Sequence, residues 1–374
     1  MYFVHPQIHP VKCCFTAILS LAKLFNGVKL SRQLSKYFPG KQWVFTDMGR
    51  SAFKVIVEKL NLQNSEILMP AYICEIFYPI LKNYNIKPIF LDINPNTFHI
   101  KTEEIEKKIT PQTKSILICH TYGLPFNVET IRTSNNSNIS NLIIIEDCAH
   151  SFGANTGNRG GAAFFSLYKQ FPTLRGGMVV CPKDWEIILP KTSFGFRDFI
   201  SFLNCFPFFA LFFKRFGRNI APRMVRHEKM QGPAGINKVS LFLFSRSLDS
   251  FEKSLENRKK LALIFQGELK KLGFEVQEAR GNVFCYLSAL VPEGFKEKRD
   301  DIVQKLRKYG VFCNRIWHTP VILNKDAQKE YQIDLKEFPN TLEAAKRIII
   351  FPLQNHYQEK DIQKMVAAIK KVIS

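Results

Sequence analysis

The stretch Ile143-Ile144-Ile145-Glu146-Asp147-Cys148-Ala149-His150 says most about the fold of this chain and about where its chemistry lies. An apolar run typical of a buried strand ends in an acidic pair, and a histidine follows three residues after Asp147. Lys169 comes nineteen residues past His150, and Gly176-Gly177 then opens a further apolar run. The pattern predicts a strand that brings Asp147 and His150 to its carboxyl end, followed by a loop that carries Lys169.

Apolar runs and helical stretches alternate around this segment, from Trp43 to Val180. Such alternation predicts an α/β fold with a mostly parallel sheet and helices on both faces. The predicted strands are Glu66–Pro70, Pro88–Asp92, Ser115–Cys119 and Leu142–Glu146, and the predicted helices are Ser51–Leu60, Ile73–Tyr84 and Thr102–Lys108, the last capped by Thr102. Ligands of such sheets bind beyond the carboxyl ends of the strands, where we expect Asp92, His120 and Asp147.

The second half of the chain predicts a smaller α/β domain. Val239–Leu272 predicts a long amphipathic helix or a helix pair, and helices are also expected at Lys298–Tyr309 and Asp361–Val372, with strands at Asn282–Leu287 and Val311–Cys313. We therefore expect an N-terminal segment at 1–40, a large domain at 41–238, and a connecting helix with the small domain at 239–374.

An insert at 190–238 interrupts the pattern of the large domain. Ten of the 34 Phe residues lie between Phe194 and Phe216, and Phe199–Phe213 is uncharged. A bilayer span needs about 20 apolar residues, so this run is too short, and Pro207 interrupts it. Two interpretations stay open. We favour a helical hairpin that packs on the large domain or at a dimer interface; the other is a wedge in a membrane surface, with Arg197, Lys214, Arg215 and Arg218 on anionic head groups.

Composition limits the classes of partner. The chain has 374 residues, of which 46% are hydrophobic, and its formal net charge of +21 favours acidic substrates. Basic residues are scattered, so we expect no nucleic acid. The nine Cys show no Cys-x-x-Cys spacing and do not cluster with His, which indicates reduced thiols in the cytoplasm and no metal site. We expect Cys13–Ala22 to form an amphipathic helix rather than a signal peptide.

An Asp at a strand end, a Lys on a loop and a Gly pair that opens a strand form the layout that a pyridoxal 5'-phosphate (PLP) site needs. The Lys holds the aldehyde as a Schiff base, and the Asp pairs with the protonated pyridine nitrogen. Taken alone, these residues leave a plainer interpretation open, because such an Asp can cap a helix and a single Lys among 53 basic residues can lie on the surface.

Further motifs favour the PLP interpretation. They are Gly49-Arg50-Ser51-Ala52, Met69-Pro70-Ala71-Tyr72, Asp92-Ile93-Asn94, His120-Thr121-Tyr122-Gly123, Glu146-Asp147-Cys148-Ala149-His150, Ser166 with Lys169, and Ile349-Ile350-Phe351-Pro352-Leu353. Together these motifs resemble the DegT/DnrJ/StrS family of PLP-dependent aminotransferases, and the resemblance runs from about Phe45 to the C-terminus.

The resemblance implies a fold-type-I PLP transferase and a role for each matching residue. Asp147 binds the pyridine nitrogen, His150 lies by the ring hydroxyl, and Lys169 is the Schiff-base lysine. The cofactor phosphate is held by Gly49, Arg50 and Ser51 at a helix N-terminus, which favours anions, and by Ser166. Tyr72 is the aromatic residue expected near the ring.

The chain departs from the family pattern at three places. Ser166 and Lys169 are three residues apart, where five is usual. Cys74 stands where an aromatic residue is common. The family's Asn-Tyr-Arg loop, which reaches the partner subunit's phosphate, is echoed only by Gly217-Arg218-Asn219.

The resemblance also implies the activity: transfer of an amino group, with glutamate as donor, to a keto-sugar or related keto substrate in polysaccharide biosynthesis, by a homodimer. Some relatives replace the lysine and act as dehydratases; Lys169 argues against that chemistry. Two alternatives remain, a non-catalytic or regulatory protein with the PLP fold, and a membrane-associated PLP enzyme that acts on a lipid-linked substrate.

Overall fold

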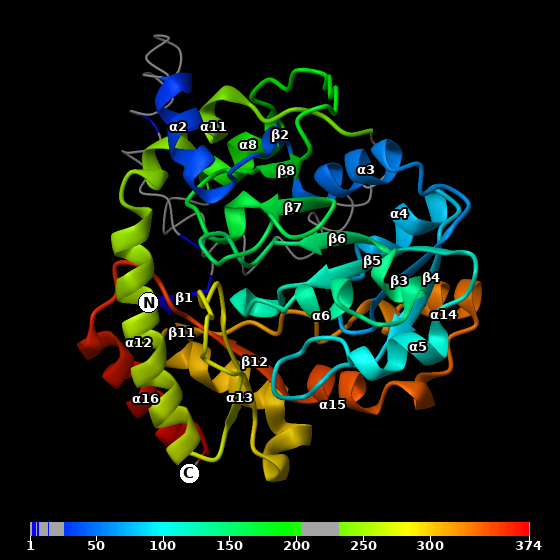
Figure 1. Ribbon diagram of the computed structural model, residues 1–374. Helices are drawn as coiled ribbons and strands as arrows, with labels where there is room; N and C mark the ends of the chain where they lie inside the picture. Colours follow the sequence, from blue (N-terminus) through cyan, green and yellow to red (C-terminus); the bar gives the residue numbers. More distant parts are fainter. Residues whose placement is uncertain (1, 5, 7–13, 15–25, 204–231, 374) are drawn as a thin grey trace.

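The computed structural model describes residues 2–4, 6, 14, 26–203 and 232–373. A seven-stranded sheet of order β2-β8-β7-β6-β5-β3-β4 forms its centre (Figure 1). The strands are β2 (Gln42–Thr46), β3 (Glu66–Pro70), β4 (Lys87–Leu91), β5 (Thr113–Cys119), β6 (Ile143–Asp147), β7 (Ala162–Ser166) and β8 (Gly177–Cys181). Within this sheet β8 alone runs against its neighbours β7 and β2, while the other four pairings are parallel. The predicted mostly parallel sheet is confirmed.

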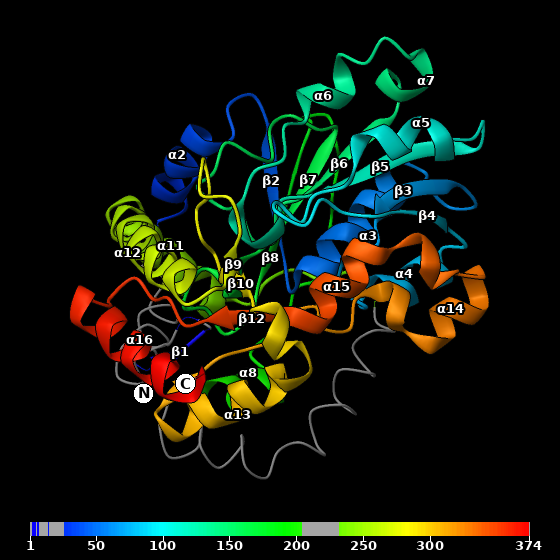
Figure 2. The ribbon, with the colours of Figure 1, turned by 90° about the horizontal axis from the view of Figure 1, so that it is seen from below.

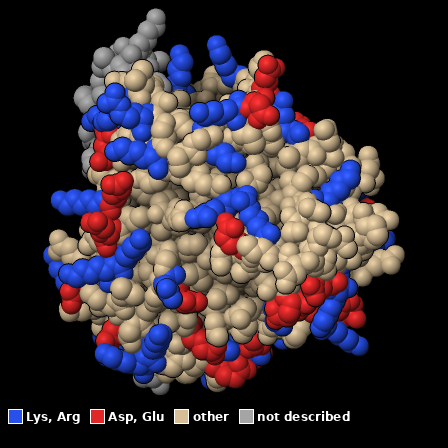
Figure 3. Space-filling model, viewed as in Figure 1, with Lys and Arg blue, Asp and Glu red and all other residues tan. Residues whose placement is uncertain are grey.

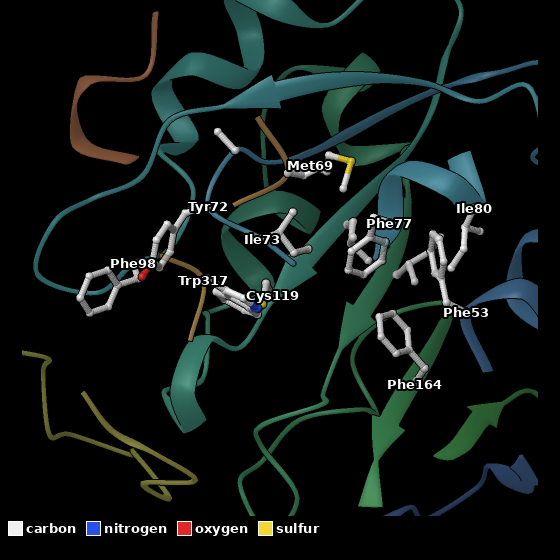
Figure 4. Packing of buried hydrophobic residues seen from close by; sticks show 14 of the residues in the cluster. Phe53, Met69, Tyr72, Ile73, Phe77, Ile80, Phe98, Cys119, Phe164 and Trp317 are labelled. Atoms are coloured by element: carbon white, nitrogen blue, oxygen red, sulfur yellow. The ribbon is translucent and has the colours of Figure 1, made fainter. Parts of the chain in front are cut away.

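Both faces of the sheet are covered, because successive strand residues point to opposite sides. Leu117 and Cys119 face the core under α3 (Gly49–Lys59) and α4 (Phe77–Asn83), whereas Ile116 and Ile118 face the other side. There the cover is α5 (Ile105–Lys108), α6 (Glu129–Arg132) and α7 (Ser137–Ser140), with α2 (Gly27–Tyr37) and α11 (Lys238–Leu248) over β7 and β8. Figure 4 shows the packing of the α3 side, where the rings of Phe53, Phe77 and Phe164 meet.

The small domain is an antiparallel sheet of order β12-β10-β9, made of β9 (Glu275–Val276), β10 (Leu287–Leu290) and β12 (Ile348–Phe351). It packs with α13 (Arg299–Lys308), α15 (Pro339–Arg347) and α16 (Glu359–Ile373), and α14 (Lys325–Tyr331) lies beside the large domain (Figure 2). At the N-terminus, β1 (Tyr2–Phe3) pairs with β11 (Val311–Phe312), so the start of the chain is held at the small domain.

Helix α12 (Phe251–Lys271) connects the two parts. Its first half, including Phe251 and Leu255, belongs to the core of the large domain, and its second half, from Leu261 on, belongs to the core of the small domain. The sequence was compatible with either a single helix or a pair of helices over this region. The structure shows a pair, because Asp249 and Ser250 separate α11 from α12.

Three predicted elements are corrected. The strand expected at Asn282–Leu287 begins only at Leu287, because Phe284 has a positive φ of 47° that breaks extended structure. The helix expected over Ile73–Tyr84 covers only Phe77–Asn83. Thr102 is not a cap but the first residue of a 3-10 turn, Thr102–Glu104, that follows Lys101.

Two predicted features lie wholly or largely outside the described residues, namely the N-terminal helix at Cys13–Ala22 and most of the Phe-rich insert. Of the insert, the structure describes α8 (Phe196–Leu203) and the segments at its base. In the described ranges, no helix is both long enough and apolar enough to span a bilayer.

Candidate active site

Asp147 and Lys169 meet at the carboxyl edge of the sheet. Asp147 is the last residue of β6, and Lys169 ends the 3-10 turn Leu167–Lys169 that follows β7, the neighbouring strand. Asp147 is 4% exposed, and its carboxylate accepts a hydrogen bond from the N–H of Ala149 at 2.9 Å. Burial raises the pKa of Asp147, and the nearby charge of Lys169 opposes this shift without cancelling it. A carboxylate in this setting is stabilised by a cationic partner.

His150 contacts Lys169 directly, with 2.9 Å between His150 Nε2 and Lys169 Nζ. The other ring nitrogen, Nδ1, accepts the N–H of Tyr122 at 3.2 Å. A neutral imidazole whose Nδ1 accepts a hydrogen bond carries its proton on Nε2. His150 then donates to Lys169, which must be an uncharged amine to accept.

The charge state of Lys169 is balanced between opposing effects. Burial is the largest effect and lowers the pKa of Lys169, but charge on Tyr168, Asp147 and nearby cysteines turns the net direction upward. An ammonium would donate to His150 Nε2, and the neutral imidazole would then carry its proton on Nδ1, where it could not accept from the Tyr122 N–H. The Tyr122 contact therefore favours the uncharged amine, whereas the raised pKa of Lys169 favours the ammonium.

A narrow cradle for an anion lies beside this pair, at the N-terminus of α3. A Cβ atom on Gly49 would approach Phe165 O and Ser166 Cβ to 3.2 Å, and one on Gly177 would lie 2.4 Å from Met48 O. Only glycines allow these segments to come so close. α3 has no side-chain cap, and the first turn of such a helix presents backbone N–H groups to anions. Ser51 and Ser166 are both buried.

Arg50 adds positive charge to the cradle. Its side chain is largely buried, and burial lowers the pKa of its guanidinium, while Asp47, Tyr168 and Cys74 oppose the shift. The predicted residues Gly49, Arg50, Ser51, Ser166, Asp147, His150 and Lys169 thus come from three segments that meet at one edge of the sheet.

Tyr72 lies in an aromatic cluster next to His150. Its hydroxyl is 2.8 Å from that of Tyr122, and its ring packs on Phe98 and, edge-on, on Trp317 (Figure 4). Trp317 comes from the small domain and lies over the His150 ring, with 5.1 Å between ring centroids. Cys74 lies within electrostatic reach of both Lys169 and Asp147.

Sequence reasoning missed the contributions of the small domain to this site. Trp317 and Tyr286 contact His150, and Cys285 Sγ lies 3.9 Å from Lys169 O. No motif indicated these residues, because they follow Lys169 by more than a hundred positions and reach it only through domain packing. The rarity of Trp, with three in the chain, is the one signal that pointed to Trp317.

Glu146, the neighbour of Asp147, holds the edge of the sheet together. Its carboxylate accepts hydrogen bonds from His120 Nε2 at 3.0 Å and from the N–H groups of Gly157, Arg159 and Gly160. His120 Nδ1 accepts the N–H of Phe126 at 3.0 Å, so Nε2 is the donor. Burial alone would raise the pKa of Glu146, but these hydrogen bonds outweigh burial and lower it.

The same residues form a spatial cluster that their sequence spacing did not reveal. Ligand atoms of His120, Glu146 and Cys148 lie within 4.8 Å of one another. However, both Glu146 oxygens already accept hydrogen bonds and His120 Nε2 carries a proton, so the contacts describe a structural network rather than open metal ligands.

Asp92 reaches the predicted edge but serves a different purpose. Its buried carboxylate accepts hydrogen bonds from the N–H groups of Asn340 and Thr341 and from the Thr341 hydroxyl, at the start of α15. Asp92 therefore joins β4 to the small domain.

Known proteins of one family resemble this chain along most of its length. The family model described as the DegT/DnrJ/EryC1/StrS aminotransferase family matches residues 26–370. A dTDP-4-amino-4,6-dideoxy-D-glucose transaminase of Shigella dysenteriae is 23% identical over 358 residues, which cover 92% of this chain and 89% of the relative. A GDP-4-keto-6-deoxy-D-mannose 3-dehydratase of Escherichia coli O55:H7 is 24% identical over 330 residues, 80% of each chain.

The fold is shared with solved enzymes. A putative sugar aminotransferase of Streptococcus pneumoniae, solved in its PLP form, superposes with a TM-score of 0.76 at 17% identity, over 99% of this chain and 97% of that one. The match of the family model spans nearly the whole chain and includes each segment that forms the Asp147–Lys169 site. This chain belongs to the DegT/DnrJ/EryC1/StrS aminotransferase family.

Proposed function

We propose that this aminotransferase uses PLP to move an amino group from glutamate to a keto-sugar, and we favour a nucleotide-linked sugar. The observation that carries the proposal is the contact of the partly buried Lys169 with the buried His150, 2.9 Å apart, beside the carboxylate of Asp147. The glycine cradle at Gly49 and Gly177 supports the proposal. The segments that contain these glycines pack closely together, and the backbone N–H groups at the start of α3 are left for a phosphate.

The residues of the site divide the work. When bound, PLP supplies an aldehyde that reacts with amines and a protonated ring that draws electrons from the reacting carbon. Asp147 would keep the ring nitrogen protonated, through a charge-assisted contact of about 1.5–3 kcal/mol. Ser51, Ser166 and Arg50 would hold the phosphate. Lys169, as a free amine, would move the proton of the substrate carbon, and His150 would exchange a proton with its Nζ.

Charge supports a phosphorylated sugar as the acceptor. The net charge of +21 attracts acidic substrates, and basic side chains are spread widely over the face in Figure 3. The named relatives act on dTDP- and GDP-linked sugars.

The visible absorbance of the purified protein tests the proposal. We expect a yellow protein whose absorbance shifts on addition of glutamate, and borohydride reduction should leave the label on Lys169. Lys259, a lysine of α12, provides the control: Lys259→Ala should remain yellow while Lys169→Ala loses the reducible bond. A colourless protein would favour the non-catalytic alternative, and a label on another lysine would overturn the assignment of Lys169.

A further inference from the structure

Arg258 carries a buried positive charge that has no acidic partner. It lies on α12, three residues after Leu255 and three before Leu261, and this spacing places it on the apolar face that joins the two cores. The residue is 3% exposed. In the described parts of the chain, no carboxylate lies within ion-pair distance of it.

Hydrogen bonding leaves one edge of the guanidinium open. Arg258 Nε donates to Asn355 Oδ1 at 2.8 Å, and Asn257 holds the same loop by donating to Asn355 O at 3.0 Å. Arg258 Nη1 is buried without a hydrogen-bond partner among the described residues. Buried donors are nearly always paired, so an unpaired one on a charged group needs an explanation. With Nε occupied, the two Nη atoms form the remaining fork.

The guanidinium lies beside the centre where the amine chemistry takes place. The charge of Arg258 interacts with Cys285 and Tyr286, and the charge of Lys169 interacts with the same Cys285. Cys285 Sγ is 3.9 Å from Lys169 O, and the Tyr286 ring lies 5.0 Å from that of His150. One short segment thus separates Arg258 from the Lys169–His150 pair.

We propose that Arg258 binds a carboxylate of a substrate through its two Nη atoms. The planar fork of arginine matches a carboxylate with two parallel hydrogen bonds, and burial strengthens such a pair. The carboxylate can belong to the amino donor or to an acidic sugar. The identification of this carboxylate as a substrate group rests on the proposed function. The buried charge of Arg258 needs an anionic partner whichever reaction the protein catalyses.

Calorimetry on the full-length protein with two unreactive probes tests the proposal and separates the two sources. Glutarate represents the donor and methyl glucuronide the acidic sugar. We expect Arg258→Gln to bind one of them roughly ten- to hundredfold more weakly, as on loss of charge-assisted hydrogen bonds. Arg258→Lys should recover part of the affinity, because it keeps the charge and loses the fork. The probe whose affinity falls identifies the source of the carboxylate.

Two further variants guard against effects on folding. Asn355→Asp places a carboxylate beside Arg258 Nε, so it should compete with the probe and weaken binding while the fold remains stable. Arg347→Gln is the matched control, because Arg347 is also buried but is already paired with Glu275 and Glu343. It should leave probe binding unchanged.

Probe binding tests the role of Arg258 separately from the proposed function, which the absorbance change with glutamate tests. Weaker probe binding in Arg258→Gln supports the site even if glutamate leaves the absorbance unchanged. Equal binding by wild type and Arg258→Gln, or no binding of either probe to wild type, overturns the inference even if glutamate converts the cofactor normally.

Discussion

At the residue scale, Glu146 shows how a motif residue can act without touching the chemistry. Its carboxylate binds His120 and the loop that contains Gly157 and Gly160, directly behind Asp147. The pKa of Glu146 is lowered in the fold, so its contribution to stability is present above the pKa of an unfolded Glu and is lost as the pH falls through the folded value.

Glu146→Gln should therefore destabilise the protein at pH 7 by about 3 kcal/mol, because an amide cannot accept from all of these donors. The difference from wild type should shrink as the pH falls below the ordinary carboxyl range. Urea unfolding at several pH values measures both effects. Glu129→Gln is the control, since Glu129 forms only an exposed pair with Arg159. A difference that stays constant with pH would contradict the argument.

Asp147 should matter to turnover more than to cofactor retention. An Asn at this position keeps the shape of the side chain but cannot carry the charge that holds the ring nitrogen protonated. We expect Asp147→Asn to retain part of the bound PLP, read from absorbance, and to lose at least about tenfold in turnover, as for one charge-assisted contact. Turnover at the wild-type rate would show that Asp147 has another role.

At the element scale, the contact between β4 and α15 fixes the small domain against the sheet. Asp92→Ala would leave the first N–H groups of α15 and the Thr341 hydroxyl without their acceptor. We expect a loss of roughly 2–3 kcal/mol in the free energy of unfolding. Glu330→Ala removes an exposed pair with Lys82 and should cost less than about 1 kcal/mol. Equal losses in the two variants would show that the buried contact contributes little.

Helix α8 leaves apolar side chains at the surface of the described chain. Phe196 is 68% exposed and Phe199 46% exposed. Asp198 of the same helix is buried, at 2.6 Å from Arg175 and 2.9 Å from Asn237, so both ends of the insert are held at the large domain. This anchoring favours packing against protein over insertion into a membrane.

We therefore expect the protein to stay at the bottom when floated with vesicles of anionic lipid at low salt. Phe196→Ser and Phe199→Ser should behave like wild type, and so should Val28→Ser, which changes an exposed apolar residue of α2. The membrane interpretation would be established if the wild-type protein floated, the two Phe variants did not, and Val28→Ser floated like wild type.

At the scale of the whole molecule, we expect a homodimer, as the family resemblance implies. Light scattering should give a mass near twice the 43.2 kDa of the chain. The exposed face of α8 provides apolar surface that a second subunit would bury, so Phe196→Ser with Phe199→Ser should weaken the dimer on dilution. A monomer that still transaminates would contradict this expectation.

The sequence by itself determined the central sheet, and it predicted which residues lie at the carboxyl edge of that sheet. The apolar runs at β3, β5 and β6 are short and continuous, because strands covered on both faces need no polar side. The motif around Asp147 and the distance from Lys169 to the Gly pair follow from local chain geometry, which spacing records. The sequence was less informative about Asn282–Leu287, where a left-handed Phe284 interrupts an apolar run that looked like a strand.

Only the tertiary structure decided what surrounds Lys169. Trp317 and Tyr286 contact the His150 ring, and Arg258 lies beyond Cys285 and Tyr286, although no local pattern in the sequence connects these residues. Packing likewise decided the partner of each acidic residue. Asp92 accepts hydrogen bonds from the start of α15, Glu146 accepts them from a loop, and Asp147 lies near the charge of Lys169. Hydrogen-bond partners depend on distances of a few ångströms in the folded chain, and sequence spacing carries no such distances.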